Sequence, residues 1–162
     1  LFVPSGSQSG YKANGNFTVP INGTVAVTAD FDLRKSVVLT GSGSTYILNP
    51  TLKIIVNNQA GEIKGTISNL LSTNKYIIYV YEKDKYTASE SSEPTGENVS
   101  FPNAITSTKL ESNGSYQFSF LAAGSYDLII VSETSAGITK VEKTIAGVIV
   151  ESKKSTLVNS SL

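Results

Sequence analysis

The stretch KYIIYVYEK, residues 75–83, carries apolar or aromatic side chains on both faces of an extended chain. The even positions from 76 to 80 share one face, and the odd positions from 77 to 81 share the other. A strand with only one face buried has polar side chains on its other face, which residues 75–83 do not have. Residues 75–83 are therefore predicted to form a central strand of a sheet.

Further strands are predicted on both sides of this one, at the short spacing that is typical of β-sandwiches. No segment has a convincing helical period. The sequence therefore predicts an all-β fold of two small antiparallel β-sandwich units in tandem, immunoglobulin-like or transthyretin-like. The predicted strands lie within residues 17–21, 24–33, 36–57, 61–71, 112–121, 122–133, 138–145 and 147–162.

A polar break at residues 57–61 (NNQAG) gives the predicted domain boundary. The first domain is predicted at residues 1–57 and the second at residues 60–162. Residues 82–103 are rich in charge, Ser, Gly and Pro, and they predict a long exposed loop inside the second domain.

The charge balance argues against nucleic acid as a partner. The 162 residues include 13 basic and 13 acidic ones, which cancel, and no Lys/Arg cluster is longer than a pair. No apolar run reaches the roughly 18 to 20 residues of a membrane span.

The missing residue types limit the chemistry that the chain can perform. It has no His, Cys, Met or Trp, which excludes imidazole and thiol catalysis, thiolate zinc sites and haem ligation. We therefore expect no enzyme activity, no cofactor and no metal site. Because there is no Met, Leu1 is expected to follow a processing site or to begin a fragment, with any export signal already removed.

Asp30 and Asp32 are the most suggestive pair of carboxylates. At positions i and i+2 of a predicted strand they share one face, as a cation site or an acid–base pair would require. Calcium would need six to eight oxygen ligands, which this segment does not supply. The alternative is a solvated strand edge in which Asp32 pairs with Arg34 or Lys35, and the sequence favours it.

Two further surfaces are candidate interaction sites. Tyr79, Tyr81 and Tyr86, together with Tyr76, could stack on sugar rings, although tyrosine packs equally well within sheets.

The acidic loop is the other candidate, because its carboxylates could contact a partner or attract cations. A merely soluble charged loop is the more common case. Its residues are Glu90, Glu93 and Glu97.

N-x-S/T triplets offer glycan acceptors if the source glycosylates its proteins. In a chain this rich in Asn, Ser and Thr, several such triplets arise by chance. They begin at Asn16, Asn22, Asn98, Asn113 and Asn159.

The C-terminal segment alternates apolar residues that include Val148, Val150 and Leu157. It is predicted to close the second sandwich. The alternative is that it adds as a donated strand to a neighbour.

Three motifs in the first third of the chain resemble a bacterial family known as a domain of unknown function, numbered 4382. They are the VPSG-G-K segment at 3–12, FDLRKS at 31–36 and the segment 46–50. Members of that family look like secreted or lipid-anchored β proteins. The resemblance covers the family's closing part, so it implies that the first unit is incomplete at its N-terminus.

The second unit is similar to transthyretin-like and carboxypeptidase-regulatory-like β-sandwiches, through GEIKGTI at 61–67 and GSYQFSFLAAGSYDLIIV at 114–131. Neither resemblance supplies catalytic residues.

Together these features predict a non-enzymatic structural or assembly protein outside the cell or in its envelope, whose partner is a second copy or another envelope protein. An incomplete first unit would leave unpaired strand edges. Strand donation from an identical neighbour would cover them and build a head-to-tail fibre. The alternatives are a carbohydrate- or protein-binding surface module of the adhesin type and, last, a glycosidase that uses only carboxylates.

Overall fold

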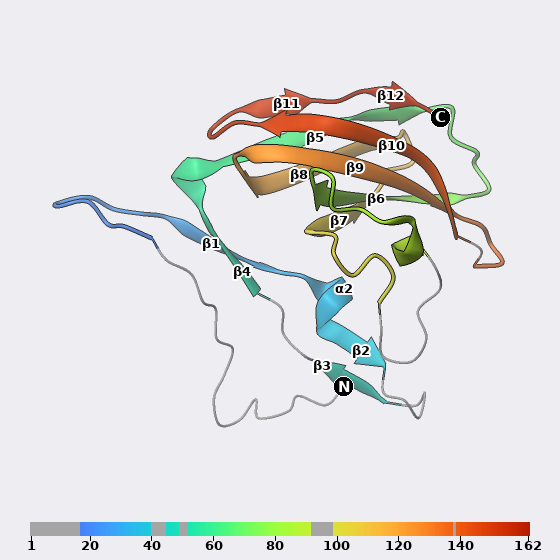
Figure 1. Cartoon of the computed structure of the whole chain (residues 1–162), viewed down its shortest axis with the longest axis horizontal. Helices are drawn as coiled ribbons and strands as arrows, with labels where there is room; N and C mark the ends of the chain where they lie inside the picture. The colour runs from blue at the N-terminus through green and yellow to red at the C-terminus, as the bar shows by residue number, and fades with distance from the viewer. Residues whose placement is uncertain (1–16, 40–44, 49–51, 92–98, 138) are drawn as a thin grey trace. The chain divides into compact units, whose positions relative to one another are not determined.

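The computed structural model describes residues 17–39, 45–48, 52–91, 99–137 and 139–162 (Figure 1). Strands dominate these residues, and helical structure in them is confined to one four-residue α-helix and two short 3-10 turns. The prediction of an all-β fold is confirmed.

The chain divides into two compact units. Unit 1 comprises Leu1–Asn58 and Ser92–Pro102, and unit 2 comprises Gln59–Ser91 and Asn103–Leu162. The first division falls inside the polar break at residues 57–61. The segment Ser92–Pro102 belongs to unit 1, although the sequence placed it in the second domain.

The larger sheet of unit 2 has four antiparallel strands in the order β10-β9-β6-β7. They are β10 (Thr139–Val150), β9 (Gly124–Glu133), β6 (Lys75–Glu82) and β7 (Thr106–Lys109). Strand β6 lies between β9 and β7, so the central strand predicted from residues 75–83 is confirmed.

The second sheet of unit 2 is built around β5 (Ala60–Ser68). On one side β5 pairs antiparallel with β8 (Ser115–Ala122). On the other side it pairs parallel with β11 (Ser155–Leu157) and β12 (Ser160–Ser161). The C-terminal residues therefore complete this sheet within the same chain.

The core of unit 2 lies between its two sheets. Its side chains come from alternate positions of β5, β6, β8, β9 and β10, as the pleat of a strand requires. Fully burying an aliphatic side chain contributes about 1.5–3 kcal/mol. The members with no exposed surface are Ile63, Ile78, Val80, Leu128 and Ile130.

In unit 1, β1 (Val27–Phe31) pairs with β4 (Leu52–Val56), and β2 (Val37–Leu39) pairs with β3 (Tyr46–Leu48). Both pairs are antiparallel. Among the described residues neither pair has a third strand.

The strands predicted at residues 17–21 and 24–33 are wrong in their extent. Residues 17–26 form no strand, because a turn closes between Pro20 and Gly23, whose N–H donates to the Pro20 carbonyl (2.9 Å), with Asn22 at a φ of 60°. The strand β1 ends at Phe31 because the Asp32 side chain accepts a hydrogen bond from the Lys35 N–H (3.2 Å). Such a bond is typical of a helix N-cap.

Helix α2 (Leu33–Ser36) follows this cap and holds a distant part of unit 1. The Arg34 guanidinium donates to the carbonyls of Ser100 (2.8 Å) and Phe101 (3.1 Å). These two bonds join Ser100 and Phe101 to helix α2 within unit 1.

Candidate interaction surfaces

The structure separates the two aspartates of the first unit. Asp30 lies exposed on β1, opposite Lys53 of β4. Asp32 caps α2, and its other carboxylate oxygen lies 3.8 Å from the Arg34 guanidinium. The predicted pairing of Asp32 with Arg34 or Lys35 is confirmed, but Asp32 caps a helix instead of lying on a strand edge.

Of the tyrosines proposed as a sugar platform, Tyr79 and Tyr81 are buried and Tyr86 is half-buried. Tyr79 is 6% exposed and Tyr81 is 0% exposed, and Tyr86 packs edge-on against Tyr81 with ring centroids 5.3 Å apart. Tyr76, on the opposite face of β6, is 7% exposed and belongs to the core. Faces buried in this way cannot stack on a sugar ring, which counts against a glycan platform on these residues.

Glu90, which was expected at an exposed loop tip, is 8% exposed instead. Its carboxylate accepts hydrogen bonds from the Tyr81 hydroxyl (2.9 Å), the Asn103 N–H (3.0 Å), the Asn103 side-chain amide (3.2 Å) and the Thr87 hydroxyl (3.3 Å). Burial raises the pKa of Glu90, but the bonds from Asn103, Tyr81 and Thr87 together outweigh it and hold the pKa below its usual value. Glu90 therefore anchors its loop.

Glu93 and Glu97 lie outside the described residues. Within the described ones, no group of three or more acidic, His or Cys side chains is placed to hold a metal ion.

The residues of the suggested donated strand lie within unit 2. Val148 and Val150 belong to β10, opposite Tyr126 and Gly124 of β9, and they are 7% and 2% exposed. Leu157 lies in β11 and is 66% exposed. The first two could be donated only if β10 left the core.

Two of the N-x-S/T asparagines serve the fold. The Asn159 side-chain oxygen accepts from the Thr66 N–H (2.9 Å), and that of Asn113 accepts from the Ser115 N–H (2.9 Å). Asn22 is exposed in its turn, and Asn16 and Asn98 lie outside the described residues.

Residues 17–26 form an exposed segment, which we call the arm. Every residue of the arm is exposed except Val25, which is half-buried. Phe17, Val19 and Ile21 alternate along it and are 47%, 54% and 95% exposed. Apolar side chains that are contiguous and exposed mark interaction sites in soluble proteins.

Strand β8 has one edge that no described strand covers, because β5 is its partner on the other side. Phe120 on this strand is 41% exposed, with a φ of 57°. Bulky residues rarely adopt this left-handed conformation, and such strain concentrates at functional sites. An open strand edge is a template for pairing with another chain.

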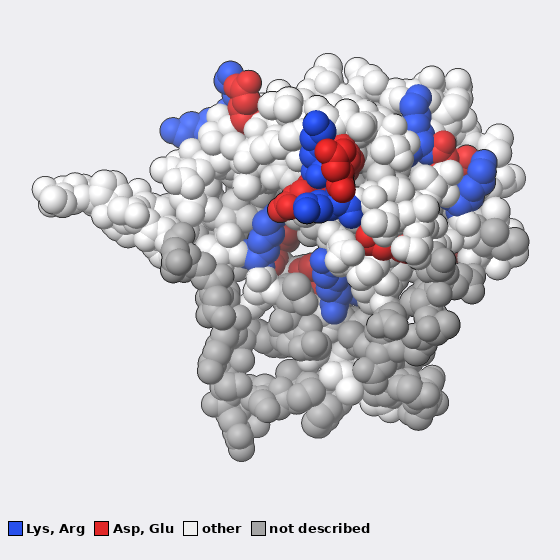
Figure 2. Space-filling view, in the orientation of Figure 1, with Lys and Arg blue, Asp and Glu red and all other residues white. Residues whose placement is uncertain are grey.

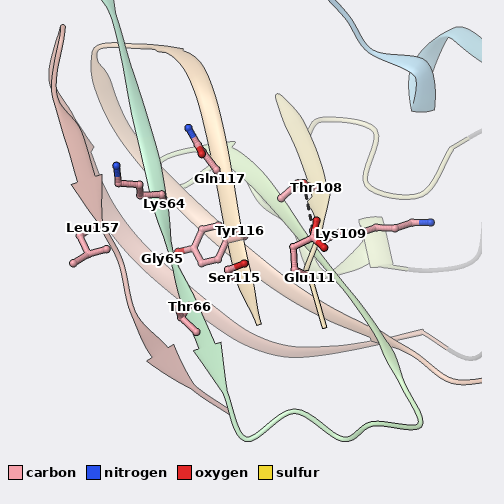
Figure 3. Close-up of a pocket in the computed structure, with 10 residues that line it drawn as sticks. All are labelled: Lys64, Gly65, Thr66, Thr108, Lys109, Glu111, Ser115, Tyr116, Gln117 and Leu157. Atoms are coloured by element: carbon pink, nitrogen blue, oxygen red, sulfur yellow. Dashed lines mark hydrogen bonds between the residues drawn. The ribbon is translucent and has the colours of Figure 1, made fainter. Parts of the chain in front are cut away.

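A hollow of about 560 Å³ extends from β5 across β8 to β7, and so passes over this edge (Figure 3). Lys64 and Thr66 of β5 line it together with Ser115 and Gln117 of β8, and Lys109 of β7 borders it. Its lining is half polar and half apolar, and the hydroxyl of Tyr116, which belongs to the lining, donates to the Val158 carbonyl (2.8 Å).

A second hollow, of about 390 Å³, continues the first, because the two share Lys109 and Glu111. Leucine side chains line it, at positions 70, 71 and 110. The two hollows together follow the hairpin between β7 and β8, and the second is the more apolar.

Charges on the described surface are paired rather than gathered. On the face shown in Figure 2, basic and acidic side chains lie next to each other in several places. The ion pairs of unit 2 are Lys64–Glu62, Lys140–Glu142 and Lys154–Glu151. Among the described residues, the longest helices fall well short of the length and apolar character that crossing a bilayer requires.

Sequence reasoning missed the arm and the β8 edge as surfaces. The alternating apolar residues of the arm predict a strand. The same alternation carries no information on whether a partner strand lies beside it. Only the conjunction of Pro20 with the following Asn22–Gly23 pair signalled a turn there.

Comparison with protein families finds one match, at residues 1–50, to a family described as "Domain of unknown function (DUF4382)". It supports the resemblance seen in the motifs at 3–12, 31–36 and 46–50. The match covers less than a third of the 162 residues. No curated protein matches the chain.

Several solved structures resemble the chain at low identity. A minor pilin of the Gram-positive pathogen Streptococcus agalactiae is 21% identical with a TM-score of 0.38, over 72% of this chain and 48% of its own. A Pseudomonas aeruginosa protein suggested to bind carbohydrate is 16% identical with a TM-score of 0.33, over 67% and 92%. The major pilin subunit of Bacillus cereus is 11% identical with a TM-score of 0.31, over 73% and 32%. The chain thus spans less than half the length of either pilin.

Proposed function

We propose that this chain is a non-enzymatic structural or assembly module of the cell surface or envelope, whose copies associate by strand donation. The observation that carries the proposal is the arm, a run of exposed residues with alternating apolar side chains next to a two-stranded sheet.

The arm and the sheet of β1 and β4 are both unfavourable in isolation. An exposed apolar side chain forgoes about 1.5–3 kcal/mol of burial free energy. A two-stranded sheet is at best marginally stable in water, and three or more strands are usually needed. Strand pairing with a neighbour would bury the apolar side chains of the arm and give its backbone hydrogen-bond partners in one step.

The buried carboxylates of unit 2 favour a structural role over a catalytic one. Asp127 is 5% exposed and accepts from the N–H groups of Asp84 and Gly147, both at 2.8 Å. These bonds hold the turn after β6 and the bulge in β10. Glu90 is engaged in the same way, so neither carboxylate faces an open cleft.

A binding module for protein or carbohydrate is the second candidate function, and the hollow over the β8 edge favours it. Hydroxyl, amide and ammonium groups from Thr66, Ser115, Gln117 and Lys64 line this hollow, and such groups fix the orientation of polar ligands. Glycan-array binding that is lost in Gln117→Ala would support this candidate.

The self-association of the full chain tests the leading candidate. Light scattering after gel filtration over a hundredfold range of concentration should show mass rising above the 17.2 kDa monomer. Electron microscopy of the concentrated sample should show linear assemblies. A monomer at every concentration, with no particles beyond monomer size, contradicts the proposal.

A further inference from the structure

We infer that the free edge of β8, with the hollow beside it, is the acceptor site for the arm of a second copy of this chain. The inference rests on the proposed function and deepens it, because it assigns both the donor and the acceptor.

The acceptor offers backbone groups that no described strand uses. The Ile67 N–H donates to the Gly114 carbonyl (2.9 Å), and hydrogen bonding alternates along an antiparallel pair. The backbone groups of Tyr116 and Phe118 therefore face β5, and those of Gln117 face away from it. The Ser115 carbonyl accepts from the Glu111 N–H on that same outer side (3.0 Å).

Only one of the two alternating sets of residues in the arm can direct its backbone N–H and C=O groups toward this edge. Backbone groups of alternate residues of an added strand face its partner. Pro20 has no N–H, so it must belong to the set that faces away. Phe17 and Val19 then direct their backbone groups toward β8, and the turn between Pro20 and Gly23 ends the added strand.

The charges of the acceptor site also favour an uncharged donor such as the arm. Residues 13–29, which include the arm, contain no charged side chain. In the hollow, Lys64 is paired with Glu62 (3.0 Å), which also accepts from the Gln117 amide (3.0 Å). With Lys64 already paired, an uncharged strand that packs over it leaves no unpaired charge at this residue, whereas a charged segment would bring one.

The size of the contact predicts a reversible association. A standard protein interface uses about 20–30 residues a side, and the ten residues of the arm fall well short of that number. The main-chain bonds of strand addition and the exposed Phe120 would add to the contact. We expect dissociation constants on the order of micromolar for a single contact.

The donor lies in unit 1 and the acceptor in unit 2, so the two surfaces differ. A contact between two different surfaces is heterologous and propagates from copy to copy unless it closes into a ring. The inference thus predicts linear assemblies rather than symmetric dimers.

Disulfide cross-linking tests the assignment directly, because the chain has no cysteine of its own. Full-length Val19→Cys would be mixed with full-length Gln117→Cys, one copy carrying a mass tag, under mild oxidation. The control acceptor is Lys140→Cys on β10, an edge strand of the larger sheet, whereas β8 belongs to the second sheet. The side chain of Lys140 is 72% exposed. We expect the mixed dimer with Gln117→Cys to form at least tenfold faster than with Lys140→Cys.

A second pair of variants tests the backbone bond. Gln117→Pro removes an N–H that β5 does not use, so the fold should survive, as a thermal melt would verify. Gln117→Ala keeps that N–H while shortening the side chain. We expect Gln117→Pro to weaken self-association at least tenfold and Gln117→Ala to change it less than threefold.

The outcomes separate the two proposals. Association that persists in Gln117→Pro, with equal cross-linking to Gln117→Cys and Lys140→Cys, overturns the acceptor site and leaves self-association standing. A wild-type chain that never associates overturns the proposed function. An intramolecular disulfide in dilute Val19→Cys/Gln117→Cys shows that the arm reaches its own β8, which overturns the assignment to a second copy.

Discussion

Glu90 is a buried residue whose role depends on its ionised form. A carboxylate is acceptor-only, and the groups around Glu90 are all donors, from Tyr81, Asn103 and Thr87. The lowered pKa of Glu90 follows from this match. The charge of this side chain thus holds the loop before β7 onto the sheet.

Glu90→Gln should destabilise unit 2 by about 2 kcal/mol, because the amide's NH₂ group would face donors and leave some of them unsatisfied. Urea denaturation at pH 7 measures this change. The control is Glu111→Gln, at an exposed position, which should be close to neutral. Equal stability of the two variants would contradict the structural role of Glu90.

The lowered pKa also fixes the sign of a pH effect. The contribution of the Glu90 carboxylate is complete above its ordinary pKa of 4.5 and is lost as the pH falls through the lower folded value. The stability difference between wild type and Glu90→Gln should therefore shrink as the pH is lowered below 4.5. A difference that stays constant down to pH 2 would show that the charge is not involved.

The pKa of Tyr116 is shifted in the opposite direction to that of Glu90, so its effect on stability appears at high pH. Burial raises the pKa of Tyr116 from 10.0 to about 12, so the unfolded state loses this proton first. The corresponding stability is present below pH 10 and is lost as the pH rises toward 12. Tyr116→Phe should cost about 1 kcal/mol at pH 7, through the lost bond to Val158.

The same substitution should flatten the loss of stability between pH 10 and 12. Tyr46→Phe, at a tyrosine that is 53% exposed in unit 1, is the control. An alkaline titration of stability that is identical in Tyr116→Phe and wild type would contradict the burial argument.

At the scale of elements, the contact between β5 and the C-terminal residues depends on two glycines, Gly61 and Gly65, and the approach at Gly65 is the tighter. A Cβ atom added at Gly65 would lie 1.9 Å from the Val158 carbonyl oxygen, and backbone cannot move aside cheaply. The Val158 N–H also donates to the Lys64 carbonyl on β5 (2.9 Å). The absence of a side chain at 65 therefore lets the last strands lie against β5.

Gly65→Ala should cost about 2 kcal/mol or more by forcing these strands apart. Gly124→Ala is the matched control, because its added Cβ would make an ordinary contact of 3.5 Å with the Tyr126 hydroxyl. Thermal denaturation of both variants measures the difference. Similar melting temperatures for both would show that the C-terminal strands can shift at little cost.

The strands of unit 2 could be predicted because each carries its signal locally. Residues 75–83 alternate apolar side chains on two faces, and the structure places them in the centre of a sheet. The end of β1 was missed because Asp32 fits an extended strand and a helix N-cap equally well from its neighbours. The bonds from Arg34 to Ser100 and Phe101 span 66 and 67 residues, which no local pattern reports.

At the scale of the whole molecule, the two units should differ in local stability. The amides of β6 and β9 should exchange slowest, because Ile78, Val80, Leu128 and Ile130 have no exposed surface. Those of β1 should exchange much faster, since β1 has one described partner and Val27 is 42% exposed. Hydrogen exchange with mass spectrometry tests this order, and equal protection of β1 and β9 would contradict it.

The candidate surfaces were predicted less well than the fold. The sequence left two interpretations open for Tyr79 and Tyr81, because tyrosine suits both the surface and the interior of a sheet, and it placed Glu90 in an exposed loop. Burial is decided by what packs over a side chain, and Tyr86 and Glu90 itself cover Tyr81. A charged residue in a loop therefore predicted an exposed side chain, whereas Glu90 is an internal anchor.

The sequence by itself determined the all-β class, the absence of His and Cys chemistry, the balanced charge and the position of most strands in unit 2. These follow from residue types and from periods of two residues, which are local properties. The tertiary structure alone decided that Ser92–Pro102 belong to unit 1, that the last strands pair parallel with β5, and that the arm and one edge of β8 stay uncovered. These depend on contacts between residues far apart in the chain, where packing and strand pairing act and local patterns carry no information.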